Sequence, residues 1–279
     1  MPERVFLSEE GARVVLERMT IRHGRPSVQQ ECDGGMLTWG SLTLRSRVVT
    51  DNTANGGGGS CSPGSVRLTL SNCSVKGNTA HRIAEQSLEC GSGGGITSGG
   101  ESLRLINTTV SGNQAGLEKV TSDPRPRPLG GGVHIGCGCT AVCTNSTISN
   151  NIAAGLGGGI YLRGPSDYFN TIIANNGGGD GDCRVDSTSV GTGSIGANRY
   201  NLVEEGTCDP EVRDDPMVGP LGDDGGDTQT HALMPGSPAI DAVPLASCDV
   251  STDQRGGLRG VVQTAQETPC DIGAFEVQG

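Results

Sequence analysis

A nine-residue unit recurs along residues 16–176, and this repetition limits the chain to folds that stack similar pieces. The unit reads apolar–x–Asn/Ser–x–x–Val/Ile–x–x–Asn. Its copies are LERMTIRHG from Leu16 (degenerate), LRSRVVTDN from Leu44, LSNCSVKGN from Leu70, LINTTVSGN from Leu105, CTNSTISNN from Cys143 and YFNTIIANN from Tyr168. The central aliphatic residues of successive copies are 28, 26, 35, 38 and 25 residues apart. A repeat of this length cannot bury its apolar face alone, so a solenoid is expected.

The residues between the copies favour short strands with tight corners. Residues 66–70 and 103–105 alternate apolar and polar side chains with the period of a strand. Glycine is unusually frequent, with 47 residues in 279, and it clusters before or after the copies, for example at 93–95, 130–132 and 157–159. Such clusters fit corners that need positive φ or close backbone approach. We therefore predict an all-β, right-handed parallel β-helix of about six to eight coils (a pectate-lyase-like solenoid) over residues 1–203.

Asparagine occupies two equivalent positions of the unit. The first column contains Asn72, Asn107, Asn145 and Asn170, and the second contains Asn52, Asn78, Asn113, Asn151 and Asn176. In a stacked solenoid each column lies along one corner, so we predict that at least one forms a ladder of hydrogen-bonded side chains.

The C-terminal segment resembles a known family. Residues 215–221 (DPMVGPL) continue through GDDGGDTQTHALMPGSPAIDA, followed by TDQRG at 252–256 and CDIGAFE at 270–276. These motifs resemble the closing segment of bacterial secreted β-helix proteins of the choice-of-anchor Q type. The repeats are loosely similar to those of polymorphic outer membrane proteins. The resemblance implies a secreted or surface-attached protein without established activity, and that the chain is a fragment lacking the family's N-terminal signal and first coils.

The net charge excludes some classes of function, and the cysteine content indicates the cellular compartment. The net charge of −11 argues against nucleic-acid binding, which needs a basic footprint. No apolar run is long enough to span a membrane. Eleven cysteines favour an oxidising compartment, so we expect an extracellular or outer cell-surface location. Two pairs, Cys183 with Cys208 and Cys248 with Cys270, bracket loops in the C-terminal third of the chain and are disulfide candidates. We expect residues 204–279 to form an irregular, cysteine-containing C-terminal cap.

Two groups of residues have the composition of weak metal sites. Cys137, Cys139 and Cys143 lie close together in sequence near His134, but a second zinc half-site is missing, and buried thiols or an intercoil bridge are the alternative. Asp223, Asp224 and Asp227 offer carboxylates that calcium would accept, without the spacing of a calcium-binding loop. We expect no metal or other cofactor, with calcium at the aspartates as the alternative.

An enzyme on this fold would need converging acids and cations. A glycosidase uses two carboxylates in one cleft, and a polysaccharide lyase uses a base with cationic or metal neutralisation. The repeats carry few acidic residues, because these gather in the cap and the inserts, and His23, His81, His134 and His231 are scattered. His231, within THAL, is expected to be a structural turn residue.

The longest insertions follow the final asparagine of a unit, over residues 80–90 and 115–128. Stacking would place both on one side, and insertions on one face often mark a binding face. The candidate contact residues are His81, Arg82, Glu85, Lys119, Arg125 and Arg127; neutral surface loops are the alternative. We expect a non-catalytic adhesin or surface scaffold that contacts an extracellular glycan or a host or neighbour surface protein, with a polysaccharide lyase or glycoside hydrolase as the alternative.

Overall fold

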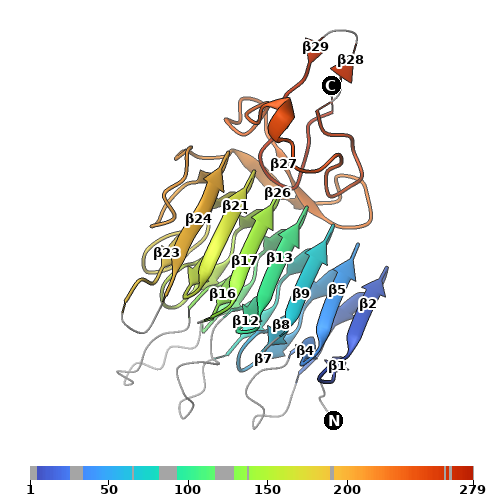
Figure 1. The fold of residues 1–279 in the computed structure, drawn as a ribbon, viewed down its shortest axis with the longest axis vertical. Helices are drawn as coiled ribbons and strands as arrows, with labels where there is room; N and C mark the ends of the chain where they lie inside the picture. Colours follow the sequence, from blue (N-terminus) through green and yellow to red (C-terminus); the bar gives the residue numbers. More distant parts are fainter. Residues whose placement is uncertain are drawn as a thin grey trace.

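The computed structural model describes residues 5–25, 34–64, 66–81, 93–116, 129–136, 138–188, 192–260, 262–263 and 266–278. Three parallel sheets of seven strands each run side by side along the molecule (Figure 1). Every coil passes through sheets 1, 2 and 3 in turn before the chain rises to the next coil. The predicted parallel β-helix is confirmed, and the described part of the chain forms seven such coils.

The strands of the sheets pair in sequence order. Sheet 1 contains β1 (Phe6–Ser8), β4 (Met36–Thr38), β8 (Ser60–Ser62), β12 (Ile96–Ser98), β16 (Val133–Ile135), β20 (Ile160–Leu162) and β23 (Cys183–Val185). Sheet 2 contains β2 (Arg13–Glu17), β5 (Ser41–Arg45), β9 (Arg67–Ser71), β13 (Ser102–Ile106), β17 (Thr140–Thr144), β21 (Pro165–Phe169) and β24 (Ser194–Arg199). Sheet 3 contains β3 (Thr20–Arg22), β6 (Val48–Thr50), β10 (Ser74–Lys76), β14 (Thr109–Ser111), β18 (Thr147–Ser149), β22 (Ile172–Ala174) and β25 (Leu202–Val203). A short corner sheet follows sheet 3 with β7 (Thr53–Ala54), β11 (Thr79–Ala80), β15 (Gln114–Ala115) and β19 (Ile152–Ala153).

The central aliphatic residues of the repeat form one column of the core. Ile21, Val49, Val75, Val110, Ile148 and Ile173 pair in register between neighbouring strands of sheet 3 and are buried. Alternate leucines of sheet 2, such as Leu68 and Leu70, point into the same interior. Burial of these stacked side chains is the main stabilising contribution that one coil makes to the next.

The second asparagine column is the predicted ladder. The Nδ2 group of each asparagine donates to Oδ1 of the equivalent asparagine in the next coil, and each of these hydrogen bonds is 2.9 Å long. The ladder contains Asn52, Asn78, Asn113, Asn151 and Asn176 in this order. Asp182 ends the ladder, since its carboxylate accepts from both nitrogens of Asn176. The glycine clusters pack against this ladder: a Cβ at Gly95 would lie 3.0 Å from Cγ of Asn113 and 2.8 Å from the Gly132 carbonyl oxygen. A side chain at Gly95 would separate neighbouring coils.

The first asparagine column has a different role. Asn72, Asn107, Asn145 and Asn170 have φ between 46° and 55°, which places each in the left-handed region at the corner between sheets 2 and 3. Asparagine tolerates this conformation better than most residues, which explains its recurrence there. The single repeat therefore contains two asparagines with two separate structural roles.

The irregular C-terminal region has two parts. Residues 204–213 cover the last coil. The Val203 amide donates to the Val212 carbonyl, the Val212 amide donates to the Asn201 carbonyl, and Cys208 is bonded to Cys183. Residues 216–278 instead lie along the outer side of sheet 3 (Figure 1), and they include β26 (Val218–Gly222), β27 (Thr230–Leu233), η1 (Leu245–Ser247), β28 (Val262–Gln263) and β29 (Gln266–Glu267). We call residues 216–278 the flank. The proposed division of the chain into domains at residue 203 stays a prediction.

The flank is attached through a second core and a row of polar contacts. Ile172, Ala174 and Leu202 of sheet 3 pack against flank residues that include Leu233 and Ile272. Towards the N-terminal coils the contacts become polar, namely Ser111 Oγ to His231 Nε2 at 2.9 Å, Thr109 Oγ1 to Gln254 Oε1 at 2.7 Å, and Lys76 Nζ to Gln229 Oε1 at 2.5 Å. Because the flank covers sheet 3, sheet 2 keeps the broad outer surface that solvent reaches.

Candidate functional site

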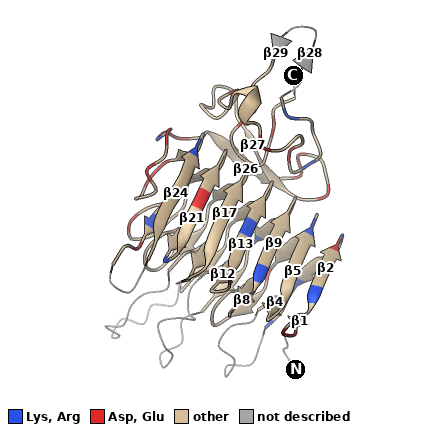
Figure 2. Ribbon diagram, in the orientation of Figure 1, with Lys and Arg blue, Asp and Glu red and all other residues tan. Residues whose placement is uncertain are grey.

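The outward side chains of sheet 2 form three parallel columns across the strands. They alternate with the buried leucines, so each five-residue strand exposes its first, third and fifth residues. We call this surface the arginine face. Its basic residues are Arg13, Arg45, Arg67, Arg104 and Arg199, all exposed. Figure 2 shows basic residues on β2, β9 and β13 and an acidic residue on β21.

The arginines differ in how firmly they are held. Arg67 forms an exposed ion pair with Glu101 at 2.5 Å, which raises the pKa of Arg67 through a hydrogen bond from the guanidinium. Arg45 lies 3.9 Å from Glu17. Arg199 stacks over the Phe169 ring at 5.1 Å. Within the part of the chain that the structure describes, Arg104 has no ion pair. The Arg45–Glu17 and Arg67–Glu101 pairs are exposed, and exposed ion pairs are weak.

The carboxylates of this face do not converge. Glu17 on β2 and Asp167 on β21 are the acidic residues of the described strands of sheet 2. Five strand spacings separate them, or about 24 Å at ~4.8 Å per strand. Asp167 also accepts a hydrogen bond from the Ala197 amide at 2.7 Å. Glycosidases hold their two carboxyl groups within roughly 10 Å of each other, so this pair does not match that geometry.

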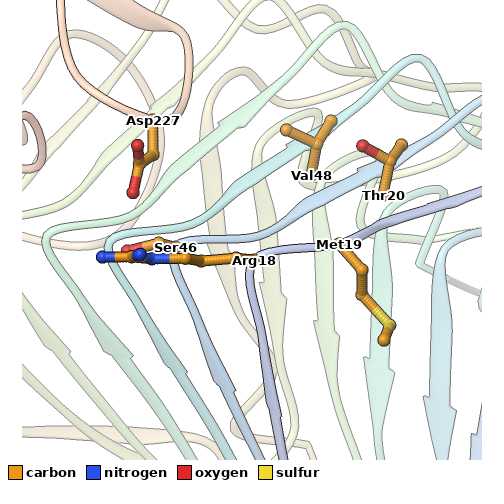
Figure 3. Close-up of a pocket in the computed structure, with 6 residues that line it drawn as sticks. All are labelled: Arg18, Met19, Thr20, Ser46, Val48 and Asp227. Atoms are coloured by element: carbon orange, nitrogen blue, oxygen red, sulfur yellow. The ribbon is translucent and has the colours of Figure 1, made fainter.

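Two shallow cavities meet at the corner beside the arginine face. One has a volume of about 320 Å³ and is lined by Thr43, Arg45, Ser46, Thr69, Ser71, Asn72 and Ile106. The other, of about 240 Å³, is lined by Arg18, Met19, Thr20, Ser46, Val48 and Asp227. Figure 3 shows the Arg18 side chain extending past Ser46 towards the Asp227 carboxylate of the flank. Because Ser46 lines both cavities, they form adjoining hollows on either side of one corner.

A buried acid–base cluster lies on the outer side of sheet 1. His134 and Tyr161 are register partners on β16 and β20, and their rings stack with centroids 5.8 Å apart. The Tyr161 hydroxyl donates to Asp186 Oδ2 at 2.8 Å, and Arg163 Nε lies 3.8 Å from the same oxygen. Among the described residues, neither ring nitrogen of His134 has a hydrogen-bond partner.

Burial sets the protonation states in this cluster. Loss of solvation, with a smaller contribution from Arg163, lowers the pKa of His134 to about 4, so its imidazole is neutral at physiological pH. Burial raises the pKa of Tyr161 to about 12, helped by the hydrogen bond to Asp186. Burial alone would raise the pKa of Asp186, but hydrogen bonds from Thr188 and Tyr161 outweigh it and lower the pKa. The result is a neutral tyrosine donor beside an ionised aspartate.

The predicted insertion loops lie almost wholly outside the described residues. This applies to Arg82, Glu85, Lys119, Arg125 and Arg127. His81 is described: it is half-buried, and its amide donates to the Ala54 carbonyl at 2.6 Å. The two loops as a binding surface therefore stay a prediction.

The cysteines divide between bridges and core. The structure contains both candidate disulfides, Cys183–Cys208 and Cys248–Cys270, with Cα atoms 5.8 and 6.0 Å apart. Cys139 and Cys143 are free and face the interior, whereas Cys137 lies outside the described residues. Burial raises the pKa of Cys143 to about 12, so it is a neutral thiol and a poor metal ligand or nucleophile.

The aspartates considered for calcium have separate surroundings. Asp224 accepts from Thr230 Oγ1 at 2.7 Å, Asp223 accepts from the Gly225 amide at 3.3 Å, and Asp227 lines the cavity with Arg18. Among the described residues, three or more histidine, cysteine or acidic side chains do not gather into a metal-holding group. His231 lies in strand β27 and not in a turn, so the expectation of a turn residue is wrong. Its Nδ1 contacts the Gly219 carbonyl oxygen at 2.8 Å, and its Nε2 contacts Ser111 Oγ at 2.9 Å.

Sequence reasoning missed the arginine face, although its signal was visible. Arg67 and Arg104 are the polar positions of the alternating segments 66–70 and 103–105 that predict strands. Collecting those polar positions coil by coil would have shown a recurrence of arginine, serine and threonine. The buried cluster has no such pattern, because the column that contains His134 and Tyr161 has Cys61 and Thr97 in the preceding coils and repeats no residue type.

Comparisons with known protein families, with curated proteins and with solved structures find no match. The resemblance of the C-terminal motifs therefore stays a prediction from those residues. Among the described residues, the structure contains no helix with the length and apolarity needed to cross a membrane.

Proposed function

We propose that this protein is a non-catalytic β-helical scaffold, located outside the cell or on its surface, that presents a contact surface to a glycan or a protein. Two disulfides support the location, since such bonds form and persist in oxidising compartments. The C-terminal motifs and their resemblance to secreted β-helix proteins point the same way. The ligand contacts belong to the arginine face, with the insertion loops expected from the sequence as a second surface.

The exposed and rigid geometry of sheet 2 carries this proposal. The strands of sheet 2 stay in register from β2 to β21, with one shift between β21 and β24, and so hold the outward side chains at regular spacing. The flank leaves this face open to solvent. The acidic side chains of the face lie too far apart to act as a catalytic pair. Binding residues on a rigid scaffold, without converging acid and base, suit recognition better than turnover.

One observation favours the alternative of a polysaccharide lyase or hydrolase. His134, Tyr161, Asp186 and Arg163 bring acid, base and cation into one cluster on sheet 1. In the structure His134 is buried and neutral, so a substrate would reach it only after a local opening. We therefore rank catalysis second.

Product analysis separates the two functions. The protein is incubated with polygalacturonate, heparin and dextran, with and without calcium, and the polymers are then examined by mass spectrometry. Intact polymers are expected. Shortened or unsaturated products would overturn the proposal. If a Cys73→Ala control still forms these products and a His134→Ala variant does not, turnover is assigned to the sheet 1 cluster.

A further inference from the structure

We propose that the arginine face binds an extended anionic glycan whose chain lies along the solenoid axis, across the strands of sheet 2. This inference rests on the proposed scaffold function and names its ligand class. The glycan's carboxylate or sulfate groups would meet the arginines, and its hydroxyls would meet serine and threonine side chains.

The chain has a net charge of −11, but its acidic and basic residues are unevenly distributed. Residues 204–279 contain 15 acidic and three basic residues, whereas residues 1–203 contain 16 acidic and 17 basic ones. All of the net negative charge therefore belongs to the C-terminal region, most of which packs against sheet 3. Since salt screens exposed charges beyond ~8 Å at physiological ionic strength, a ligand on sheet 2 responds mainly to the local arginines.

The local balance on sheet 2 is positive. Its described strands carry five arginines against two acidic residues, and Glu101, which directly precedes β13 and pairs with Arg67, makes the acidic residues of this face three. Arg13 is register-paired with Ser41, and Arg67 is register-paired with Ser102. Since Leu42 pairs with Leu68, Arg13 and Arg67 lie in the same first outward column, and Arg104 lies in the middle column on the strand after Arg67. These three side chains thus form a patch that covers four neighbouring strands. A guanidinium offers paired donors that match a carboxylate or sulfate group.

Hydroxyl groups fill the positions between the arginines. They belong to Thr43, Thr69, Ser71, Ser102, Thr140 and Thr144, all outward on the strands of sheet 2. Sugars present many hydroxyls of their own, so a surface rich in side-chain hydroxyls can satisfy them in place of water. The cavity at Ser46 extends the same surface with Thr43, Thr69 and Ser71.

The same face lacks what single-stranded nucleic acid would need. Sequence-tolerant binding of single strands uses aromatic platforms on which bases stack. Among the described outward positions of sheet 2, the aromatic residue is Phe169. The guanidinium of Arg199 covers its ring. A glycan therefore fits better than a nucleic acid among extended polyanions.

The dimensions suit a polymer of several sugar units. Seven strands at ~4.8 Å spacing give the face a length of about 29 Å along the axis. Trp39, the one tryptophan of the chain, lies at the edge where the chain enters sheet 2 and is 47% exposed. Its ring lies beside Gly64, three residues before Arg67. Trp39 fluorescence thus reports directly on a ligand at the first outward column.

The experiment titrates the full chain with polygalacturonate and heparin oligosaccharides, with dextran and a single-stranded DNA oligonucleotide as comparison polymers. Binding is followed by Trp39 fluorescence and calorimetry at two salt concentrations. The test variant is Arg13→Gln/Arg67→Gln/Arg104→Gln. The matched control removes the same charge elsewhere, with Arg22→Gln/Arg25→Gln/Arg213→Gln, at exposed positions outside sheet 2.

We expect at least one anionic glycan to bind, more weakly as salt rises, and dextran to bind at least tenfold more weakly. The test variant should lose at least tenfold in affinity, whereas the control should stay within about threefold. Carboxylate and sulfate ligands are distinguished by which of the two glycans binds.

Several outcomes would overturn the inference: no binding of either anionic glycan, an equal loss in both variants, equal binding of dextran, or tighter binding of DNA than of both glycans. Failure of the proposed function has a different signature. If the glycans bind to this face and are also shortened, the ligand class stands and the non-catalytic assignment falls.

Discussion

The guanidinium of Arg47 is buried where the repeat otherwise places small side chains. Equivalent positions in later coils are Cys73, Thr108 and Ser146, each of which bonds to a backbone carbonyl oxygen of its own corner. Arg47 is 0% exposed, and none of its guanidinium nitrogens has a hydrogen-bond partner in the part of the chain that the structure describes. Burial lowers the pKa of Arg47, because the charged form loses its hydration.

Replacing Arg47 is therefore expected to stabilise the protein. Arg47→Met keeps the apolar stem and removes an uncompensated buried charge, which should raise the free energy of unfolding by about 1–4 kcal/mol. Urea unfolding followed by Trp39 fluorescence measures the change. Arg45→Met, at the exposed neighbouring strand position, is the control and should stay within about 0.5 kcal/mol of the wild type. A less stable Arg47→Met variant would contradict the argument.

The asparagine ladder carries a second prediction at this scale. Asn113 bonds to Asn78, Asn151 and the carbonyl oxygen of Val75, all buried. Asn113→Ala leaves several of these polar groups without hydrogen-bond partners, and each such buried group costs ~1–3 kcal/mol. The free energy of unfolding should therefore fall by about 2–5 kcal/mol. Asn145→Gly is the matched control, since glycine adopts the left-handed φ of that corner. Similar losses for both variants in thermal unfolding would mean that the ladder has no special role.

At the scale of single elements, β16 places His134 next to Tyr161 on the outer side of sheet 1. The pKa of His134 is about 4 in the folded protein, below its usual value near 6.5. Between these values the unfolded chain binds a proton that the folded chain does not. The stabilising contribution of neutral His134 is therefore complete above pH 6.5 and is lost as pH falls towards 4.

This linkage predicts a pH-dependent difference between two proteins. His134→Phe keeps the stacked ring and removes the titration. Relative to that variant, the wild type should lose about 3 kcal/mol of stability between pH 7 and pH 4, since each unit of pKa shift corresponds to ~1.4 kcal/mol. Denaturant unfolding at several pH values measures the difference. A difference that does not change with pH would exclude a depressed pKa for His134.

Elements also show where sequence reasoning succeeds and where it stops. The aliphatic residue at the centre of each copy and the asparagine that ends it predict sheet 3 and the ladder, because both recur at positions that stacking superimposes. The buried position of Arg47 breaks the chemistry of its column and could not be predicted. The contact of Ser111 with His231 joins residues 120 positions apart, and no local pattern encodes it.

At the scale of the whole molecule, the flank is a separate layer fastened to the coils. Its internal structure depends on Arg259, which is 4% exposed and donates to the Glu276 carboxylate at 2.8 Å and to the carbonyl oxygens of Asp271 and Gly273. Removing one partner of a buried ion pair leaves the other charge uncompensated, at a cost of about 3–5 kcal/mol.

Glu276→Gln should therefore loosen the flank before it loosens the coils. Amide hydrogen exchange is expected to rise across residues 216–278, while the strands of sheets 1 and 2 keep their protection. Glu17→Gln, which removes an exposed pair at 3.9 Å, should leave exchange unchanged. Uniform acceleration along the chain in Glu276→Gln would show that flank and coils unfold as one cooperative unit.

The separation of charge described above makes the molecule an electric dipole. An acidic flank covers one side, and a neighbouring side carries the arginines of sheet 2. Attached to a cationic resin, the molecule would adsorb by its flank and leave the arginines facing solution. Near a polyanionic surface it would turn the other way. The isoelectric point near 4.8 indicates only that the chain is acidic overall. The separation of charge gives the molecule, in addition, a preferred orientation in an electric field.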